Sequence, residues 1–361
     1  MAFIWKLKSS KNLFSMKTLK EFGLAIIAFI ACISMVACSN DNGTLVLEDE
    51  QEVYTVHLGW GGELDVAYEP LSRATDATDL YGIQVYSVPD KELEGEETWS
   101  PYAYGLFDNT DNISVNLLKG YKYKFIATII KDGLKKMDSE YTGNGYKGLM
   151  NPFYGTGGPT ALEHKFNYSS SWYFNDLGYG NTVLLDGNFY EHPNTDRYYG
   201  EEDNYTPDKN SNIKIKMKRA SFGAKFIAKG KAANNGSLEI EITGAPKMTL
   251  TPSADKKHIS DTFTFSNVKE AWAHNGNYSE VIEVTISWHR ADGSTIPLGT
   301  HEITYKRNAT TVVNVNVVND ASSSGVGYEI DETELGEMAE DKENETTIED
   351  GTIVEKEVET N

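Results

Sequence analysis

The chain has 361 residues and a formal net charge of −21. Residues 329–361 hold fourteen Asp or Glu and two Lys, a net charge of −12, whereas residues 1–37 are net positive and the body between them is acidic. An acidic body without a basic patch argues against nucleic-acid binding, which needs cations to displace counterions from phosphates. A chain of this length has room for one to three domains.

The N-terminal segment has the composition of an export signal. Lys17 and Lys20 precede residues 22–37, which carry no charge, and the sequence Met35-Val-Ala-Cys38 then leads into polar residues. Small residues followed directly by a cysteine resemble the lipobox of bacterial lipoproteins. The resemblance implies that residues 1–37 are removed, that Cys38 is acylated with chains such as palmitate, and that residues 38–51 form a lipid-anchored tether.

Two alternatives remain open for this segment: a plain cleaved signal peptide, or a retained helix. A membrane span needs about twenty apolar residues, and this run is shorter and ends at a small-residue site. Met16 is a possible true start, because it leaves a signal of ordinary length. The chain has one other cysteine, Cys32, which lies inside the signal. Processing therefore leaves no thiol pair for a disulfide, and the fold must depend on a packed core.

From Val53 onward the sequence predicts β-structure. β-branched and aromatic residues alternate with polar ones between turn residues, which is typical of half-buried strands. Strands are predicted at residues 53–58, 80–88, 113–118 and 121–130, the last with alternation early and a continuous apolar run late. Almost nothing in the body shows a sustained 3.6-residue period, so the fold class is mostly β.

Residues 132–212 differ from their surroundings. Fifteen aromatic residues fall within residues 141–205, among frequent Gly and Asn turn signals. We expect long, ordered excursions from a sandwich, with one or two strands among them, the best candidate being Thr182–Leu185. Residues 52–212 are thus predicted to form an N-terminal β-sandwich domain with long aromatic-rich loops.

Regular strands resume at Ile213. Seven short strands are predicted between residues 213 and 318, the last two joined in a closing hairpin by the turn Lys306-Arg-Asn-Ala. This spacing favours a second antiparallel sandwich over residues 213–320. The acidic composition of residues 321–361 cannot bury enough apolar surface to offset chain entropy, so a disordered tail is expected.

Three local patterns carry a resemblance to a known family. They are Leu71-Ser-Arg-Ala with Leu80-Tyr-Gly-Ile-Gln-Val-Tyr, Lys216-Met-Lys-Arg-Ala-Ser-Phe-Gly-Ala-Lys-Phe, and Tyr305-Lys-Arg-Asn-Ala-Thr-Thr-Val-Val-Asn-Val-Asn-Val. With the signal and two β-domains, they resemble the fimbrillin-like lipoproteins of Bacteroides and Porphyromonas relatives. The resemblance implies two transthyretin-like sandwich domains, a role in pilus assembly or cell adhesion, and no catalysis.

One feature of that family corresponds to a residue of this chain. Polymerising subunits are cut after an arginine just past the first strand, which frees a groove for a neighbour's strand. Arg73 occupies about that position, and a sheet with unpaired edge groups suits strand exchange. The alternative is that Arg73 is an exposed loop cation. The acidic tail departs from the family pattern and favours an anchor, tip or accessory subunit over a major pilin.

The sequence contains no recognisable catalytic motif, so no enzyme activity and no cofactor are predicted. Gly155-Thr-Gly-Gly-Pro is interpreted as a turn, since no strand-then-helix context surrounds it. His289 and His301 face each other across a hairpin in one interpretation, with a surface pair favoured over a metal site. The acidic residues Asp196, Glu201, Glu202, Asp203 and Asp208 are a weak calcium candidate, with solvated loop charge as the alternative.

The aromatic-rich stretch is the best site hypothesis from the sequence. Exposed Tyr and Trp give rigid faces with a polar group, suited to stacking on sugars or to contacting a protein. Trp172, Tyr173, Tyr198 and Tyr199 are the predicted contact residues. The alternative is that these rings pack the loops onto the sandwich.

The sequence therefore predicts a non-enzymatic surface lipoprotein, a fimbrillin-like subunit, anchor or accessory protein. Its expected location is the outer membrane at the cell surface, with the fimbrium as a further possibility. Its expected partners are the membrane, through the lipid, and other pilus subunits or host and bacterial surface ligands. The competing hypothesis is a glycan-binding lipoprotein of a polysaccharide-uptake system, which shares the anchor and the aromatic loops.

Overall fold

The computed structural model describes residues 52–64, 78–90, 98–110, 113–141, 147–230, 236–274 and 278–317, and the backbone of 325–334. Residues from Glu52 onward belong to one compact unit, and the preceding unit, residues 1–51, lies outside the described residues. The described part is mostly β, as predicted, with two short helices, α2 (Gly133–Lys136) and α3 (Val268–Ala273). None of its helices is long and apolar enough to cross a membrane.

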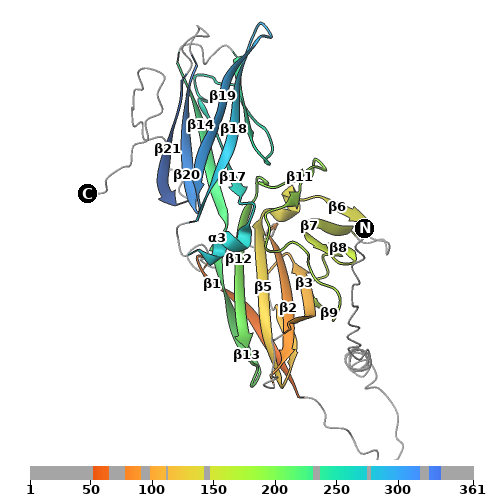
Figure 1. Cartoon of the computed structure of the whole chain (residues 1–361). Helices are drawn as coiled ribbons and strands as arrows, with labels where there is room; N and C mark the ends of the chain where they lie inside the picture. The colour runs from red at the N-terminus through yellow and green to blue at the C-terminus, as the bar shows by residue number, and fades with distance from the viewer. Residues whose placement is uncertain are drawn as a thin grey trace, which may run out of the picture. The chain divides into compact units, whose positions relative to one another are not determined.

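The N-terminal sandwich is built from eight strands (Figure 1). Their order is β4–β1–β13–β12–β5–β2–β3–β9. Their bounds are β1 (Val53–Gly62), β2 (Leu80–Pro89), β3 (Ser100–Phe107), β4 (Ser114–Leu118), β5 (Tyr121–Lys131), β9 (Phe166–Tyr168), β12 (Asp196–Tyr205) and β13 (Ser211–Arg219). Between β12 and β13 only two residue pairs form, Tyr198 with Arg219 and Tyr199 with Lys218. The sheet therefore folds there into two layers that enclose one core.

Strand β13 shows how the sequence builds this core. Ile213, Ile215 and Met217 are buried in it, while the lysines between them point outward. β13 runs parallel to β1, so it belongs to the N-terminal sandwich. The predicted domain boundary at residue 213 is therefore corrected to the β13–β14 connection at Ala220, from which onward the second core draws all its buried residues except Tyr199.

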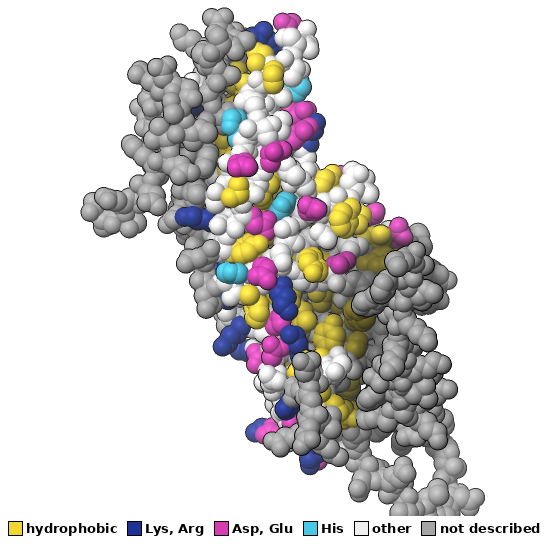
Figure 2. Space-filling model, viewed as in Figure 1, with side chains coloured by type: hydrophobic (Ala, Val, Ile, Leu, Met, Phe, Trp, Pro, Cys, Tyr) yellow, Lys and Arg dark blue, Asp and Glu magenta, His cyan; other side chains and the backbone are white. Residues whose placement is uncertain are grey.

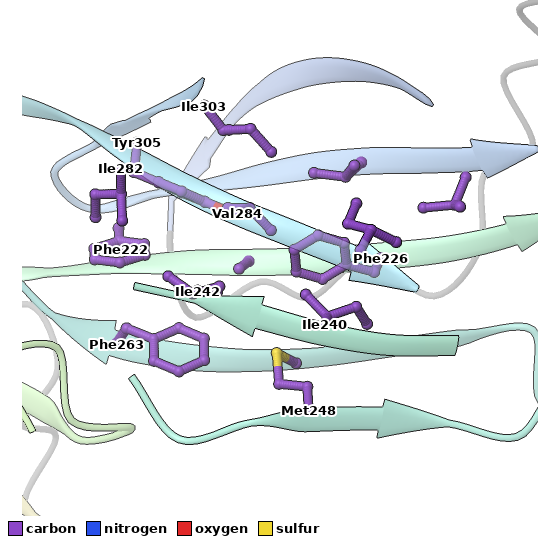
Figure 3. Close-up of a cluster of buried hydrophobic side chains, with 14 of the residues drawn as sticks. Phe222, Phe226, Ile240, Ile242, Met248, Phe263, Ile282, Val284, Ile303 and Tyr305 are labelled. Atoms are coloured by element: carbon purple, nitrogen blue, oxygen red, sulfur yellow. The ribbon is translucent and has the colours of Figure 1, made fainter. Parts of the chain in front are cut away.

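The C-terminal sandwich packs two four-stranded sheets, β17–β14–β20–β21 against β16–β15–β18–β19. Their bounds are β14 (Ser221–Lys229), β15 (Gly236–Ile242), β16 (Met248–Leu250), β17 (His258–Thr264), β18 (Ser279–Arg290), β19 (Thr295–Lys306), β20 (Ala309–Asn316) and β21 (Gly325–Glu334). Figure 3 shows side chains from both sheets meeting in the core, with Phe222 and Phe226 from β14 and Ile240 from β15 among them.

Two predictions for this region are corrected. β19 pairs with β18, whereas β20 pairs with β14 and β21, so the turn at Arg307 and Asn308 crosses between sheets and closes no hairpin. Residues 325–334, assigned to the disordered tail, form β21 along β20. The signal for β21 was the alternation of Val326, Tyr328 and Ile330, which the acidic composition around it obscured.

The excursion, residues 132–195, adds a third layer to the N-terminal sandwich. It contains the sheet β6–β7–β8 and the hairpin β10–β11. Their bounds are β6 (Ser139–Tyr141), β7 (Lys147–Gly155), β8 (Gly158–Ala161), β10 (Thr182–Val183) and β11 (Phe189–Tyr190). Its buried side chains meet Leu80 of β2 and Ile130 of β5 in a separate core. The end of β5 is thus buried on both faces, which explains its continuous apolar run.

Candidate interaction surface

Several aromatic rings of the excursion pack it onto the sandwich. Phe153 is fully buried, and a Cβ at Gly82 of β2 would lie 2.3 Å from its ring, so glycine lets the ring approach the strand. Phe174 is also buried and contacts Phe153 edge to face, with 6.0 Å between ring centroids. The packing alternative is therefore confirmed for these rings.

Trp172 is held from more than one side. Its indole stacks on Tyr104 of β3, with 3.8 Å between ring centroids and 25° between planes. Gly155 and Gly157 lie against the same indole, where a Cβ on Gly155 would come within 2.0 Å of Cζ2. The Gly155–Pro159 segment is the turn between β7 and β8, as predicted. Its glycines make room for Trp172, and the half-buried indole packs between this turn and Tyr104 of β3.

Tyr198 and Tyr199 are corrected as contact residues. Their exposed fractions are 7% and 1%. Tyr198 packs in the N-terminal core, and Tyr199 packs in the C-terminal core although it lies on β12. No local pattern indicated this burial, because β12 is an acidic, polar strand that becomes buried only in the centre of the sheet. Of the four predicted residues, Tyr173 is the one with a well-exposed side chain.

The exposed apolar side chains of the described part concentrate on the excursion. Seven large hydrophobic residues are exposed, and five of these belong to the excursion: Leu134, Tyr173, Tyr179, Leu185 and Phe189. The other two are Val53 and Val281. Figure 2 shows hydrophobic side chains at the surface on the side where Figure 1 places β11. We call these five residues the apolar surface set.

The hairpin β10–β11 explains two members of this set. Leu185 is 62% exposed and Phe189 is 55% exposed. The hairpin has two residue pairs, and Leu184 bridges to Met137 and is buried. A hairpin this short buries one face and leaves the other in solvent. The sequence signal was an apolar residue on each side of the turn Asp186-Gly-Asn, which the predicted contact set omitted.

The backbone that carries Tyr179 is fixed by a buried cation. Arg197 of β12 is fully buried and donates to the carbonyl oxygens of Leu177 at 2.9 Å and Tyr179 at 2.6 Å, and to Oγ1 of Thr128 at 2.8 Å. Burial lowers the pKa of Arg197 to about 9, although the charge of Asp176 acts in the opposite direction. The Tyr179 ring, 53% exposed, therefore projects from an anchored segment.

Contacts with the C-terminal sandwich anchor the same segment. The backbone N–H of Gly180 donates to the carbonyl of Ser266 at 2.8 Å, and that of Lys269 donates to Gly178 at 3.0 Å. Exposed aromatic residues on a fixed backbone lose little conformational entropy when they bind a partner. The geometry of this surface thus suits contact with a protein or a sugar.

The acidic residues of β12 are arranged as ion pairs, which corrects the calcium candidate. Asp196 accepts two hydrogen bonds from Arg219, each at 2.7 Å. Asp203 pairs with Lys124 at 3.1 Å, Glu202 lies next to it on β12, and Asp208 lies beyond the end of the strand at Tyr205. Among the described residues, no group of three or more His, Cys, Asp or Glu could hold a metal ion. The acidic run is a central strand, whose alternating side chains diverge to opposite faces.

Glu201 is the most enclosed of these acidic residues. Its carboxylate accepts from the Tyr199 hydroxyl at 2.5 Å and pairs with Lys124 at 2.8 Å and Lys269 at 3.0 Å. Burial acts to raise the pKa of Glu201, but the hydrogen bonds from Lys124, Tyr199 and Lys269 outweigh it and hold the pKa below its ordinary value. Because Lys269 lies on α3, this carboxylate joins the two sandwiches.

The two histidines considered from the sequence do not face each other. In the β18–β19 pairing, His289 lies opposite Thr295 and His301 lies opposite Val284. The suggested pair is therefore wrong, because the register places the residues at different positions along the hairpin. Cys38 and Arg73 lie outside the described residues. Their predicted lipidation and cleavage stay predictions.

The chain matches no protein-family model, and no curated protein matches it. Among solved structures, it is similar to the tip fimbrial protein Mfa3 from Porphyromonas gingivalis, with 10% identity, a TM-score of 0.33, and coverage of 78% of this chain and 100% of that one. A candidate cell adhesion protein from Bacteroides ovatus gives 10% identity, a TM-score of 0.34, and coverage of 81% and 100%.

A third similar structure is a candidate polysaccharide-binding protein from Bacteroides thetaiotaomicron, with 7% identity, a TM-score of 0.33, and coverage of 74% of this chain and 92% of that one. At these identities and TM-scores, the similarity by itself assigns no function to the chain.

Proposed function

We propose that this protein is a non-enzymatic, cell-surface adhesion protein that contacts its partner through the apolar surface set. The observation that carries the proposal is the concentration of exposed large hydrophobic residues on a layer whose base is firmly packed. Buried aromatics hold the layer, and Arg197 anchors the segment of Tyr179. Apolar side chains that gather on one exposed layer are typical of interaction sites.

The finer role follows from the sequence resemblance. We propose a fimbrillin-like subunit, anchor or accessory protein with transthyretin-like domains, held at the outer membrane by lipid on Cys38. A cut after Arg73 would break the covalent link between the lipid-bearing segment with β1 and the rest of the chain. The lipid is tested by Cys38→Ser, which should abolish acyl labelling and release the protein from membranes. Unchanged labelling would refute this anchor.

The adhesion surface is tested by a double variant, Leu185→Ser with Phe189→Ser, displayed on cells at wild-type abundance. Loss of the apolar contacts of these two residues should reduce adherence to host and bacterial surfaces about tenfold or more. Val281→Ser is the matched control, since Val281 is 63% exposed and lies on β18 of the C-terminal sandwich, outside the apolar surface set. Adherence of the double variant equal to that of Val281→Ser would contradict the proposal.

Glycan binding is the second candidate function, favoured by the exposed rings of Tyr173 and Tyr179. A glycan array distinguishes glycan binding from adhesion to proteins: tight binding to one polysaccharide that Tyr179→Ala abolishes would favour glycan capture.

Electron microscopy of cells with and without the gene tests the pilus role, because unchanged filaments that lack the protein would exclude assembly. Protease shaving with N-terminal sequencing reports surface exposure and any cut after Arg73.

A further inference from the structure

An ion pair between a buried arginine and a half-buried glutamate binds the end of strand β1 to the C-terminal sandwich. Glu63 follows β1 directly and accepts two hydrogen bonds from Arg307, Nη1 to Oε2 at 2.7 Å and Nη2 to Oε1 at 2.8 Å. Arg307 lies 244 positions away, in the turn between β19 and β20. The exposed fraction of the side chain is 6% for Arg307 and 34% for Glu63.

Arg219, at the end of β13, completes this contact. Its backbone N–H donates to Oε2 of Glu63 at 2.9 Å, and its carbonyl accepts from Nη1 of Arg307 at 2.9 Å. Its own guanidinium is occupied by Asp196. The carboxylate of Glu63 therefore meets both the connection between the sandwiches and the crossing turn of the C-terminal one.

Glu63 supplies the charge that balances Arg307. Among the described residues, Glu63 is the one carboxylate that forms an ion pair with Arg307, whose Nε has no hydrogen-bond partner there. Removing one member of a buried ion pair leaves an uncompensated charge, which is strongly unfavourable. Departure of β1 would impose this penalty in addition to the loss of its strand pairing with β4 and β13.

We propose that the Glu63–Arg307 ion pair retains β1 on the folded body after the chain is cut between β1 and β2. Hydrolysis adds one water across a peptide bond and leaves every contact of β1 in place, so cleavage and loss of the strand are separate steps. The biological relevance rests on the proposed function, in which Arg73 is the natural cut. The physical claim holds for a cut anywhere in residues 65–77.

The test uses the full chain with a specific protease site replacing residues 71–77 and an affinity tag within the tether. After complete cleavage, the tagged segment is held on resin and the half-life of the co-retained body is measured. Glu63→Gln removes the charge while keeping the shape, and we expect the half-life to fall at least about tenfold. Glu63→Asp keeps the charge on a shorter side chain and should give a smaller fall.

Glu52→Gln is the matched control. Glu52 lies on the same tagged segment and pairs with Lys119 at 2.7 Å, but the two side chains are 52% and 62% exposed. A surface pair contributes little, so the half-life should stay within about twofold of the parent value. Half-lives for Glu63→Gln and Glu63→Asp equal to the parent value would overturn the proposal, and the Asp variant decides alone if the Gln variant fails to fold. Absence of natural cleavage after Arg73 would remove only the processing step of the proposed function.

Discussion

The two sandwiches differ in how their sheets are covered. In the C-terminal sandwich a strand such as β15 buries one face, with Leu238 and Ile240 inside and Glu241 in solvent. In the N-terminal sandwich, β2 has six consecutive buried residues, because the excursion covers its outer face. The added layer also carries most of the exposed apolar side chains. The outer face of β15 therefore meets solvent with polar side chains, whereas the excursion over the N-terminal sandwich meets solvent with several apolar ones.

The largest expected effect tests whether the excursion is part of the cooperative fold. Phe153→Ala removes a fully buried ring between the excursion and β2 and should lower the free energy of unfolding by about 3–5 kcal/mol. Denaturant titration measures it, with Phe226→Ala in the C-terminal core as the comparison. A much smaller effect for Phe153→Ala would show that the excursion opens independently of the sandwich.

The second effect compares a buried carboxylate with a surface one. The lowered pKa of Glu201 means that its contribution is present above the ordinary carboxyl pKa and is lost as pH falls through the folded value. Glu201→Gln should cost about 3 kcal/mol at neutral pH and flatten the loss of stability on acidification.

Glu239 is the control for this pair, since it contacts Lys247 at 3.0 Å on the surface of the C-terminal sandwich. Glu239→Gln should change the free energy of unfolding by about 0–1 kcal/mol. The free energy of unfolding, measured from pH 7 to pH 3, distinguishes the Glu201→Gln variant from the Glu239→Gln variant. Parallel curves for wild type and Glu201→Gln would contradict the assignment.

A smaller effect concerns the space around Trp172. Gly155→Ala places a methyl group against the indole, and overpacking should cost about 1–3 kcal/mol. Tryptophan fluorescence should shift as the ring leaves Tyr104. Thr156→Ala is the neighbouring control, because Thr156 is an exposed turn residue. Equal stability of Gly155→Ala and wild type would show that the layer is loosely packed.

The smallest expected effect belongs to the apolar surface set. Leu185→Ser and Phe189→Ser should each change the free energy of unfolding by no more than about 0.5 kcal/mol, because both side chains are exposed. Thermal unfolding of the purified variants measures this. A large loss of stability would mean that the hairpin supports the layer, and any loss of adherence would then have a structural cause.

Sequence reasoning identified the strands whose apolar residues alternate clearly. It found β1, β2, β4, β5 and most strands of the C-terminal sandwich. It missed β12, because Glu201 and its acidic neighbours resemble loop charge until Lys124 and Lys269 neutralise the buried carboxylate. It also missed the pairing of β19 and β20 with different sheets, since strands adjacent in sequence most often form a hairpin.

The sequence by itself determined the mostly β class, the aromatic excursion and the absence of a disulfide framework after the predicted processing, because periodicity and composition are local properties. Only the tertiary structure decided which aromatic rings are buried and which are exposed. Tyr199 and Tyr179 are the same residue type and both lie in the aromatic-rich stretch of residues 141–205, yet Tyr199 is enclosed by the second core and Tyr179 projects into solvent. Burial depends on what packs against a residue from elsewhere in the chain, and no local pattern records that.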